Sequence, residues 1–105
     1  MTIYLVTTTV ANREDAEKLA RHVVDAGLAA CVHIDEIVSY YPWDGEMQRV
    51  NEVRLTLKTS VERYPNLEAA IAEHHPYDIP AIIAVPAAQT HKPYEDWVLS
   101  TIEAR

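Results

Sequence analysis

The chain has 105 residues, of which 49% are hydrophobic and 24% charged, and its formal net charge is −7. This composition is typical of a folded globular protein, and no apolar run approaches the roughly 20 residues that cross a bilayer. The nine Lys and Arg are scattered among sixteen acidic residues, without the basic stripe that nucleic-acid binders need, so we expect neither nucleic acid nor membrane as a partner.

The first part of the chain predicts a strand followed by a helix. Met1 to Val6 lacks the basic flank and cleavage site of a signal peptide. The uncharged, β-branched residues 3–9 indicate a buried strand. Asn12 is a typical helix N-cap, and an apolar stripe with helical spacing follows between Ala16 and Val24. Gly27 stands where a left-handed C-terminal cap is expected.

The middle of the chain predicts a long β-hairpin. Residues 28–43 and 47–59 have strand character, and Asp44-Gly45 between them is a tight-turn signal. The second strand alternates clearly, which places its apolar and polar residues on opposite faces. The apolar face carries Val53, Leu55 and Leu57, and the polar face carries Glu52, Arg54, Thr56 and Lys58.

The remaining elements complete the order β-α-β-β-α-β with an extra C-terminal helix. A helix begins either at the capping box Thr59-Ser60-Val61-Glu62 or one turn later at Pro65, and Pro76 ends it. Residues 79–88 predict a short strand near a sheet edge. Pro93 begins the last helix. This order is the ferredoxin-like α+β pattern, and residues 1–105 form one domain.

The hairpin is too long for the domain that carries it. Strands of about 13 residues reach about 43 Å, whereas a compact chain of this length has a diameter of roughly 33 Å. The tip carries Tyr40, Tyr41, Trp43 and Met47, which a monomer would leave in water. We favour a closed oligomer in which each hairpin packs on a neighbouring subunit. The alternative is a bend that folds the hairpin back on its own sheet.

The adjacent histidines His74 and His75, just before Pro76, are the first candidate metal ligands. Neighbouring residues on a helix diverge by about 100°, so this spacing does not by itself close on one ion. His74 also continues the apolar stripe of its helix. Spacing alone therefore favours two helix-end histidines over a metal site, although the geometry before a proline is looser and a second subunit could add ligands.

Other chemically active residues give weaker signals. Cys31 and His33 share one face of a strand, which suits a soft metal, but a lone cysteine between Ala30 and Val32 is more often a small buried residue. The polar face of the second hairpin strand could line a groove for an anion, although most such faces are simply solvated. His22 and His91 have no partner visible in the sequence.

The sequence contains no catalytic signature and no disulfide. Its two glycines do not form a phosphate loop, and nucleophile elbows and zinc-protease motifs are missing, so we expect a non-enzymatic protein. Cys31 has no second cysteine with which to pair, which fits a reducing compartment. We therefore expect a cytoplasmic protein.

Five short stretches of the chain form a recognisable series. They are Leu28-Ala29-Ala30-Cys31-Val32, Tyr41-Pro42-Trp43-Asp44-Gly45, Leu57-Lys58-Thr59, His74-His75-Pro76-Tyr77-Asp78-Ile79-Pro80 and Tyr94-x-x-Trp97. In this order and at these separations they resemble the CutA family of divalent-cation tolerance proteins. The resemblance implies a ferredoxin-like subunit, similar to the PII signalling proteins, that forms a homotrimer through its long hairpins. It implies no established catalytic activity.

The resemblance also implies a copper site. In some bacterial members a His pair before Pro-Tyr is proposed to bind copper together with a cysteine at the end of the first strand. The pair corresponds to His74 and His75, of which His75 is favoured because it lies away from the apolar stripe. The cysteine position falls on Thr8, and His33 stands where the family more often has Asn. We therefore expect a weak site for a divalent metal ion, copper above others.

An intersubunit cleft of the family supplies a second candidate site. The residues of this chain that would line it are Tyr41, Trp43, Glu52, Lys58, His75 and Tyr77. The leading hypothesis is a non-enzymatic homotrimer that binds copper and takes part in metal tolerance or homeostasis. The alternative is a PII-like protein that binds a small anionic metabolite or nucleotide in this cleft and signals to an unknown partner. Two further alternatives are an enzyme with Glu52 or His75 as base and a structural trimer.

Overall fold

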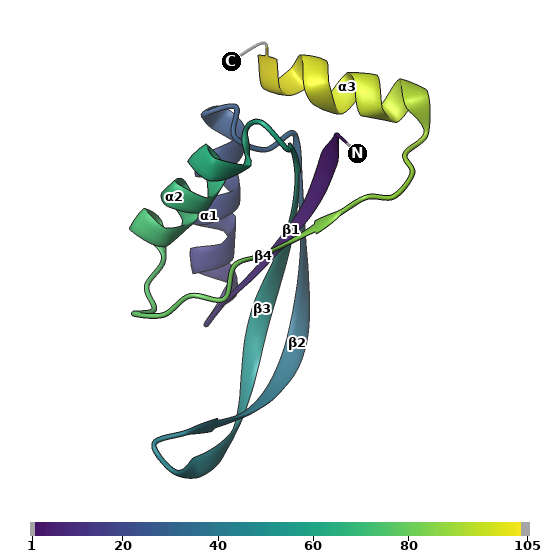
Figure 1. Ribbon diagram of the computed structural model, residues 1–105. Helices are drawn as coiled ribbons and strands as arrows, with labels where there is room; N and C mark the ends of the chain where they lie inside the picture. Colours follow the sequence, from purple (N-terminus) through teal and green to yellow (C-terminus); the bar gives the residue numbers. More distant parts are fainter. Residues whose placement is uncertain (1, 104–105) are drawn as a thin grey trace.

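The computed structural model describes residues 2–103, which form one four-stranded antiparallel sheet and three helices (Figure 1). The elements in chain order are β1 (Ile3–Val10), α1 (Arg13–Asp25), β2 (Cys31–Trp43), β3 (Glu46–Ser60), α2 (Tyr64–His74), β4 (Ile83–Pro86) and α3 (Lys92–Glu103). The strand order β2-β3-β1-β4 confirms the predicted ferredoxin-like α+β fold, with β4 at an edge. Within the described residues, no helix is long and apolar enough to cross a membrane.

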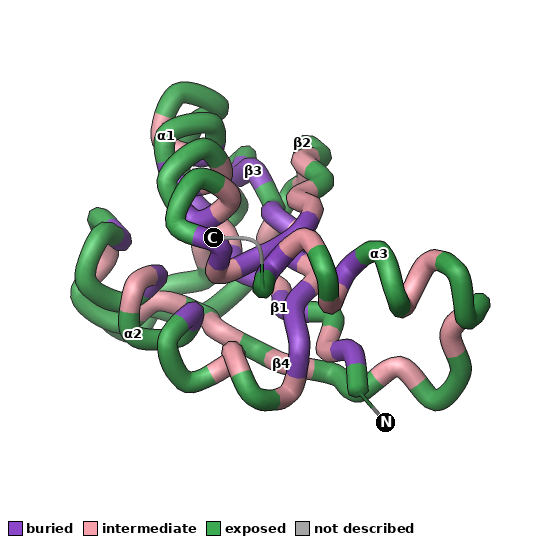
Figure 2. Tube along the Cα trace, turned by 90° about the horizontal axis from the view of Figure 1, so that it is seen from above, coloured by how far each residue is buried: buried purple, intermediate pink, exposed green. Residues whose placement is uncertain are grey.

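The core lies between the sheet and the two helices α1 and α2. Because side chains alternate across a strand, Val6 and Val10 of β1 and Leu55 and Leu57 of β3 all point to the same face of the sheet. They pack there with Leu19 and Val23 of α1 and with Leu67 and Ile71 of α2. The helix α3 lies on the opposite side, where Val98 and Ile102 contact Ile3 and Ala30 (Figures 1 and 2).

Local signals of the sequence explain most element boundaries. Asn12 accepts a hydrogen bond from the backbone N–H of Asp15 at 2.8 Å, which confirms the predicted N-cap. Gly27 adopts a left-handed φ of 71°, as expected after a helix. The strand predicted from Leu28 begins only at Cys31, because the N–H groups of residues 28 and 29 bond back to the carbonyl of Val23 at the end of α1.

In the second half, the structure confirms the later of the two predicted starts of α2 and shortens the last strand. The capping box at residues 59–62 does not start α2, which begins at Tyr64 with Pro65 in its first turn. Ser60 instead accepts a hydrogen bond from the N–H of Arg63 at 3.0 Å and closes the turn before the helix. The strand predicted over residues 79–88 is reduced to the four residues of β4, which pair with β1 alone.

The hairpin of β2 and β3 stays regular to its tip. Pairing runs from Cys31 opposite Lys58 to Trp43 opposite Glu46, and Asp44 and Gly45 turn the chain with φ values of 52° and 78°. The molecule is therefore 46 Å long but only 26 and 21 Å across (Figure 1). The alternative of a hairpin folded back on its own sheet is thus wrong.

Candidate functional site at the end of helix α2

The end of α2 separates the two histidines that the sequence places side by side. His74 is the last helical residue, whereas the backbone of His75 is already extended, with φ −79° and ψ 135°. The ring of His74 is exposed to solvent. The ring of His75 turns inward, and only 8% of this residue is accessible. One change of backbone conformation thus gives two adjacent imidazoles different surroundings.

His75 is held by hydrogen bonds at both ring nitrogens. Its Nε2 lies 2.8 Å from the carbonyl oxygen of Thr9, and its Nδ1 lies 3.1 Å from the backbone nitrogen of Tyr77. A carbonyl only accepts and a backbone N–H only donates, so Nε2 carries the proton and Nδ1 accepts. His75 therefore ties the segment after α2 to the end of β1. It would have to break one of these bonds to bind a metal.

Tyr77 extends this network to a buried carboxylate. Its hydroxyl donates to Oε2 of Glu52 at 2.8 Å, and its ring lies 4.9 Å from the ring of His75. Glu52 is only 8% exposed. Burial, together with the hydrogen bond to Glu52 and its negative charge, raises the pKa of the Tyr77 phenol well above its ordinary value. Thr9, His75, Tyr77 and Glu52 thus form one connected chain of polar groups.

This network predicts a loss of stability at alkaline pH. Because the pKa of Tyr77 is higher in the folded protein than in the unfolded chain, its stabilising contribution is complete below about pH 10 and is lost as the pH rises above that value. Tyr77→Phe should remove that part of the alkaline slope. At neutral pH it should cost about 1–3 kcal/mol, because Glu52 loses its donor. Urea unfolding between pH 7 and 11 measures both effects.

The control for this experiment is Tyr94→Phe, which removes a hydroxyl from α3 and keeps the ring beside Lys58. It should leave the alkaline loss in place. Equal alkaline slopes in the Tyr77→Phe variant and the unmodified protein would show that the Tyr77–Glu52 contact does not set the pH dependence.

Of the other predicted cleft residues, Tyr41 lies near enough to Tyr77 to add to the rise in its pKa, whereas Lys58 and Trp43 lie far from Glu52 and Tyr77 in the single chain. Lys58 is six residues from Glu52 on β3, about 20 Å away, and its ammonium group sits 5.3 Å from the ring centroid of Tyr94. Trp43 pairs with Glu46 and is similarly distant on the other side. Glu52 itself lines a cavity of about 420 Å³ with residues of β2 and β3. The predicted set can meet only if another copy of the chain contributes to it.

The polar face of β3 is already partly neutralised by its neighbours. Arg54 donates two hydrogen bonds to Asp35 of β2, at 2.8 and 3.2 Å. This contact lowers the pKa of the Asp35 carboxyl. With Lys58 over the ring of Tyr94, both cations of the proposed anion groove have partners within the subunit. This arrangement weakens the case for an anionic ligand.

The remaining metal-ligand candidates do not converge. Thr8, where the resemblance implies a cysteine, is buried on the core side of β1. Cys31 is half-buried and His33 is exposed on β2. Across residues 2–103, no three His, Cys, Asp or Glu side chains gather in a way that could hold a metal ion. The histidine with a ring nitrogen free to bind a metal is therefore His74, whereas the sequence favoured His75 as the metal ligand.

His22, for which the sequence shows no partner, meets His74 in the folded chain. It projects from α1 and its ring lies against that of His74, with centroids 4.1 Å apart and planes inclined by 40°. The two residues are far apart in the sequence and belong to different helices. No spacing pattern connects them, because their contact depends on how α1 and α2 pack.

Comparison with known proteins places the whole arrangement in one family. A family model described as CutA1 divalent ion tolerance protein matches residues 4–101. The divalent-cation tolerance protein CutA of Thermus thermophilus is 37% identical over 95 residues, which cover 90% of this chain and 92% of the relative. The human protein CutA is also 37% identical over 97 residues, but this chain spans only 54% of its length.

Solved structures agree with the sequence relatives. The structure of CutA from Synechococcus elongatus superposes with a TM-score of 0.94 at 36% identity, covering 96% of this chain and 90% of that one. CutA from Archaeoglobus fulgidus, described as a periplasmic divalent cation tolerance protein, has a TM-score of 0.93 at 29% identity, with 95% and 98% covered.

Proposed function

Since the chain belongs to the CutA1 divalent ion tolerance family, we propose that it is a non-enzymatic homotrimer that binds divalent cations and contributes to metal tolerance. Copper is the favoured ion, because imidazole sites follow the Irving–Williams order. Thr8 stands in place of a cysteine, so the site lacks a thiolate that would select Cu(I). The proposed ligand is His74, and His75 holds the segment that carries it.

One observation carries the metal-binding proposal. The Nδ1 of His74 lies 3.0 Å from the carbonyl oxygen of Ala70, which requires Nδ1 to donate in the neutral ring. The proton is then on Nδ1, and Nε2 keeps its lone pair on an exposed ring. Histidines that bind metals commonly donate their other ring N–H to a carbonyl in this way. His74 is therefore oriented as a ligand.

The trimer is supported by apolar surface that the single chain leaves exposed. At the hairpin tip Tyr40 is 65% and Met47 71% accessible. On the sheet face opposite α1 and α2, Leu5, Ile83 and Val85 are also exposed. A soluble monomer rarely exposes so many large apolar residues, and closed rotational symmetry would bury the same surfaces on every copy.

We also propose that the protein works in the cytoplasm. The lone Cys31 fits a reducing compartment. The family is found elsewhere too, since the Archaeoglobus fulgidus protein is described as periplasmic and an Arabidopsis thaliana relative as chloroplastic.

Calorimetric titration with Cu(II) at neutral pH tests the proposed function. The unmodified protein should bind Cu(II) saturably, and His74→Ala should weaken this binding roughly tenfold or more, because a direct ligand is worth at least as much as the groups that orient it. His91→Ala, which removes an exposed histidine ahead of α3, is the matched control and should bind normally. Binding that survives His74→Ala unchanged would contradict the proposal.

A PII-like role remains the second candidate. Lys58 lies too far from the buried Glu52–Tyr77 pair to meet it within one chain. A neighbouring subunit could bring its own Lys58 to this pair and so complete the cleft. Thermal-shift screening with anionic metabolites and nucleotides tests this role. A stabilised complex would favour it, and no stabilisation across the screen would count against it.

A further inference from the structure

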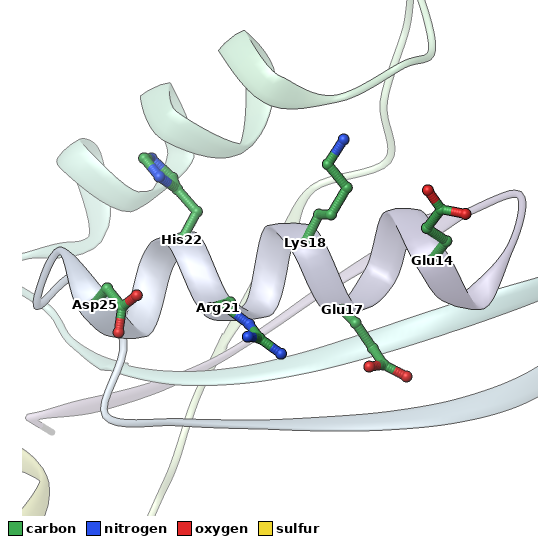
Figure 3. Close-up of a pocket in the computed structure, with 6 residues that line it drawn as sticks. All are labelled: Glu14, Glu17, Lys18, Arg21, His22 and Asp25. Carbon is green, nitrogen blue, oxygen red and sulfur yellow. The ribbon is translucent and has the colours of Figure 1, made fainter.

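The contact between His22 and His74 bridges two helices on the surface of the molecule. His22 lies in the last turn of α1 and His74 ends α2. Figure 3 shows His22 projecting from α1 toward the neighbouring helix. The ring centroids are 4.1 Å apart, although both residues are exposed. The contact places two side chains that can bind metal next to each other at the surface, one from each helix.

The hydrogen-bonding state of His74 leaves a ligand atom on this contact. Since Nδ1 donates to the carbonyl of Ala70, Nε2 of His74 keeps its lone pair and is the atom that can bind a metal. Two imidazole nitrogens that bind one ion each lie about 2.0 Å from it and hence roughly 3 Å from each other. Because the centroids are only 4.1 Å apart, rotation of the exposed His22 side chain brings its ring nitrogen to this separation while His74 keeps its hydrogen bond to Ala70. No movement of the helices is required.

The surroundings of the pair suit a hydrated cation. A cavity of about 370 Å³ opens between the helices, and it is lined by Val10, Asp15, Lys18, Leu19, His22, His74 and Pro76. The adjoining face of α1 (Figure 3) carries one more negative than positive side chain: the carboxylates are Glu14, Glu17 and Asp25, and the cations are Lys18 and Arg21. The space can hold the waters that complete the coordination of an ion with two protein ligands.

We propose that His22 and His74 together bind one divalent transition-metal ion across α1 and α2. This assignment rests on the proposed function, in which His74 is a ligand, and it names His22 rather than His75 as the second one. Two nitrogen ligands with open positions for water suit Cu(II), Ni(II) or Zn(II). Because the ligands come from two helices, a bound ion also cross-links them and stabilises the folded chain.

The test combines calorimetry with electron paramagnetic resonance of the Cu(II)-loaded protein. His22→Gln and His74→Gln should each weaken binding roughly tenfold or more, whereas His33→Gln and His91→Gln, at other exposed histidines, should not. The nitrogen hyperfine pattern should show two imidazoles in the unmodified protein and one in His22→Gln. Added Cu(II) should raise the unfolding temperature of the unmodified protein but not of His22→Gln.

The outcomes separate this inference from the function on which it rests. If His74→Gln loses Cu(II) while His22→Gln binds normally with an unchanged spectrum, His22 is not a ligand and the inference fails, although the proposed function stands. If neither variant changes the binding, both fail. Both side chains are exposed, so circular dichroism of the variants should match that of the unmodified protein.

Discussion

Trp43→Glu combined with Met47→Glu is expected to leave the chain folded and to abolish its assembly into trimers. In the single chain Trp43 is 56% and Met47 71% accessible, so neither side chain contributes much to the fold of one subunit. In a trimer built through the hairpins, both residues would be buried against a neighbour. Two carboxylates placed there would lose their hydration without gaining a partner.

Sedimentation equilibrium measures this effect. The unmodified protein should have three times the mass of one chain, and the double variant should have the mass of one. Ala69→Glu with Ala72→Glu, which adds the same charge to exposed positions of α2, is the matched control and should remain trimeric. A double tip variant that stays trimeric would show that the hairpin tips do not hold the assembly.

The second large effect is expected at His75. Replacing it with Ala removes a buried ring and leaves the carbonyl of Thr9 and the N–H of Tyr77 without their partner. The expected loss in the free energy of unfolding is about 2–4 kcal/mol. Replacing the exposed His74 with Ala should lower the free energy of unfolding by only about 0.5 kcal/mol or less. Substitution of His75 should therefore affect mainly stability, and substitution of His74 mainly metal binding.

Urea unfolding at one fixed protein concentration compares the two variants, since association contributes to apparent stability. His75→Ala should unfold at clearly lower urea yet still bind Cu(II) while it is folded. His74→Ala should unfold at the same urea concentration as the unmodified protein but bind Cu(II) more weakly. A His75→Ala variant as stable as the unmodified protein would mean that its two hydrogen bonds are not important for the fold.

Most of the fold could be predicted because its signals are local. The Asn12 cap, the left-handed Gly27 and the Asp44-Gly45 turn each depend on a few adjacent residues, and all three are confirmed. The largest departure is β4. Its length depends on pairing with β1, with which only Ile83–Pro86 are paired in register, and no property of residues 79–88 alone reveals that limit.

The candidate site was less predictable because its contacts are tertiary. The sequence identified the His74-His75 pair but not which ring is open. That depends on the carbonyl of Thr9 at the end of β1, which binds His75. Likewise the contact between His22 and His74 exists only once α1 and α2 pack side by side on the sheet. Spacing rules for one helix cannot describe a pair of ligands from two helices.

The most direct test is the anomalous scattering of a Cu(II)-loaded crystal, measured at the copper absorption edge. We expect a peak between α1 and α2, about 2.0 Å from a ring nitrogen of His74 and equally close to one of His22. A peak at Cys31 and His33, at the terminal amine or at the ring of His75, with none beside His74, would contradict it.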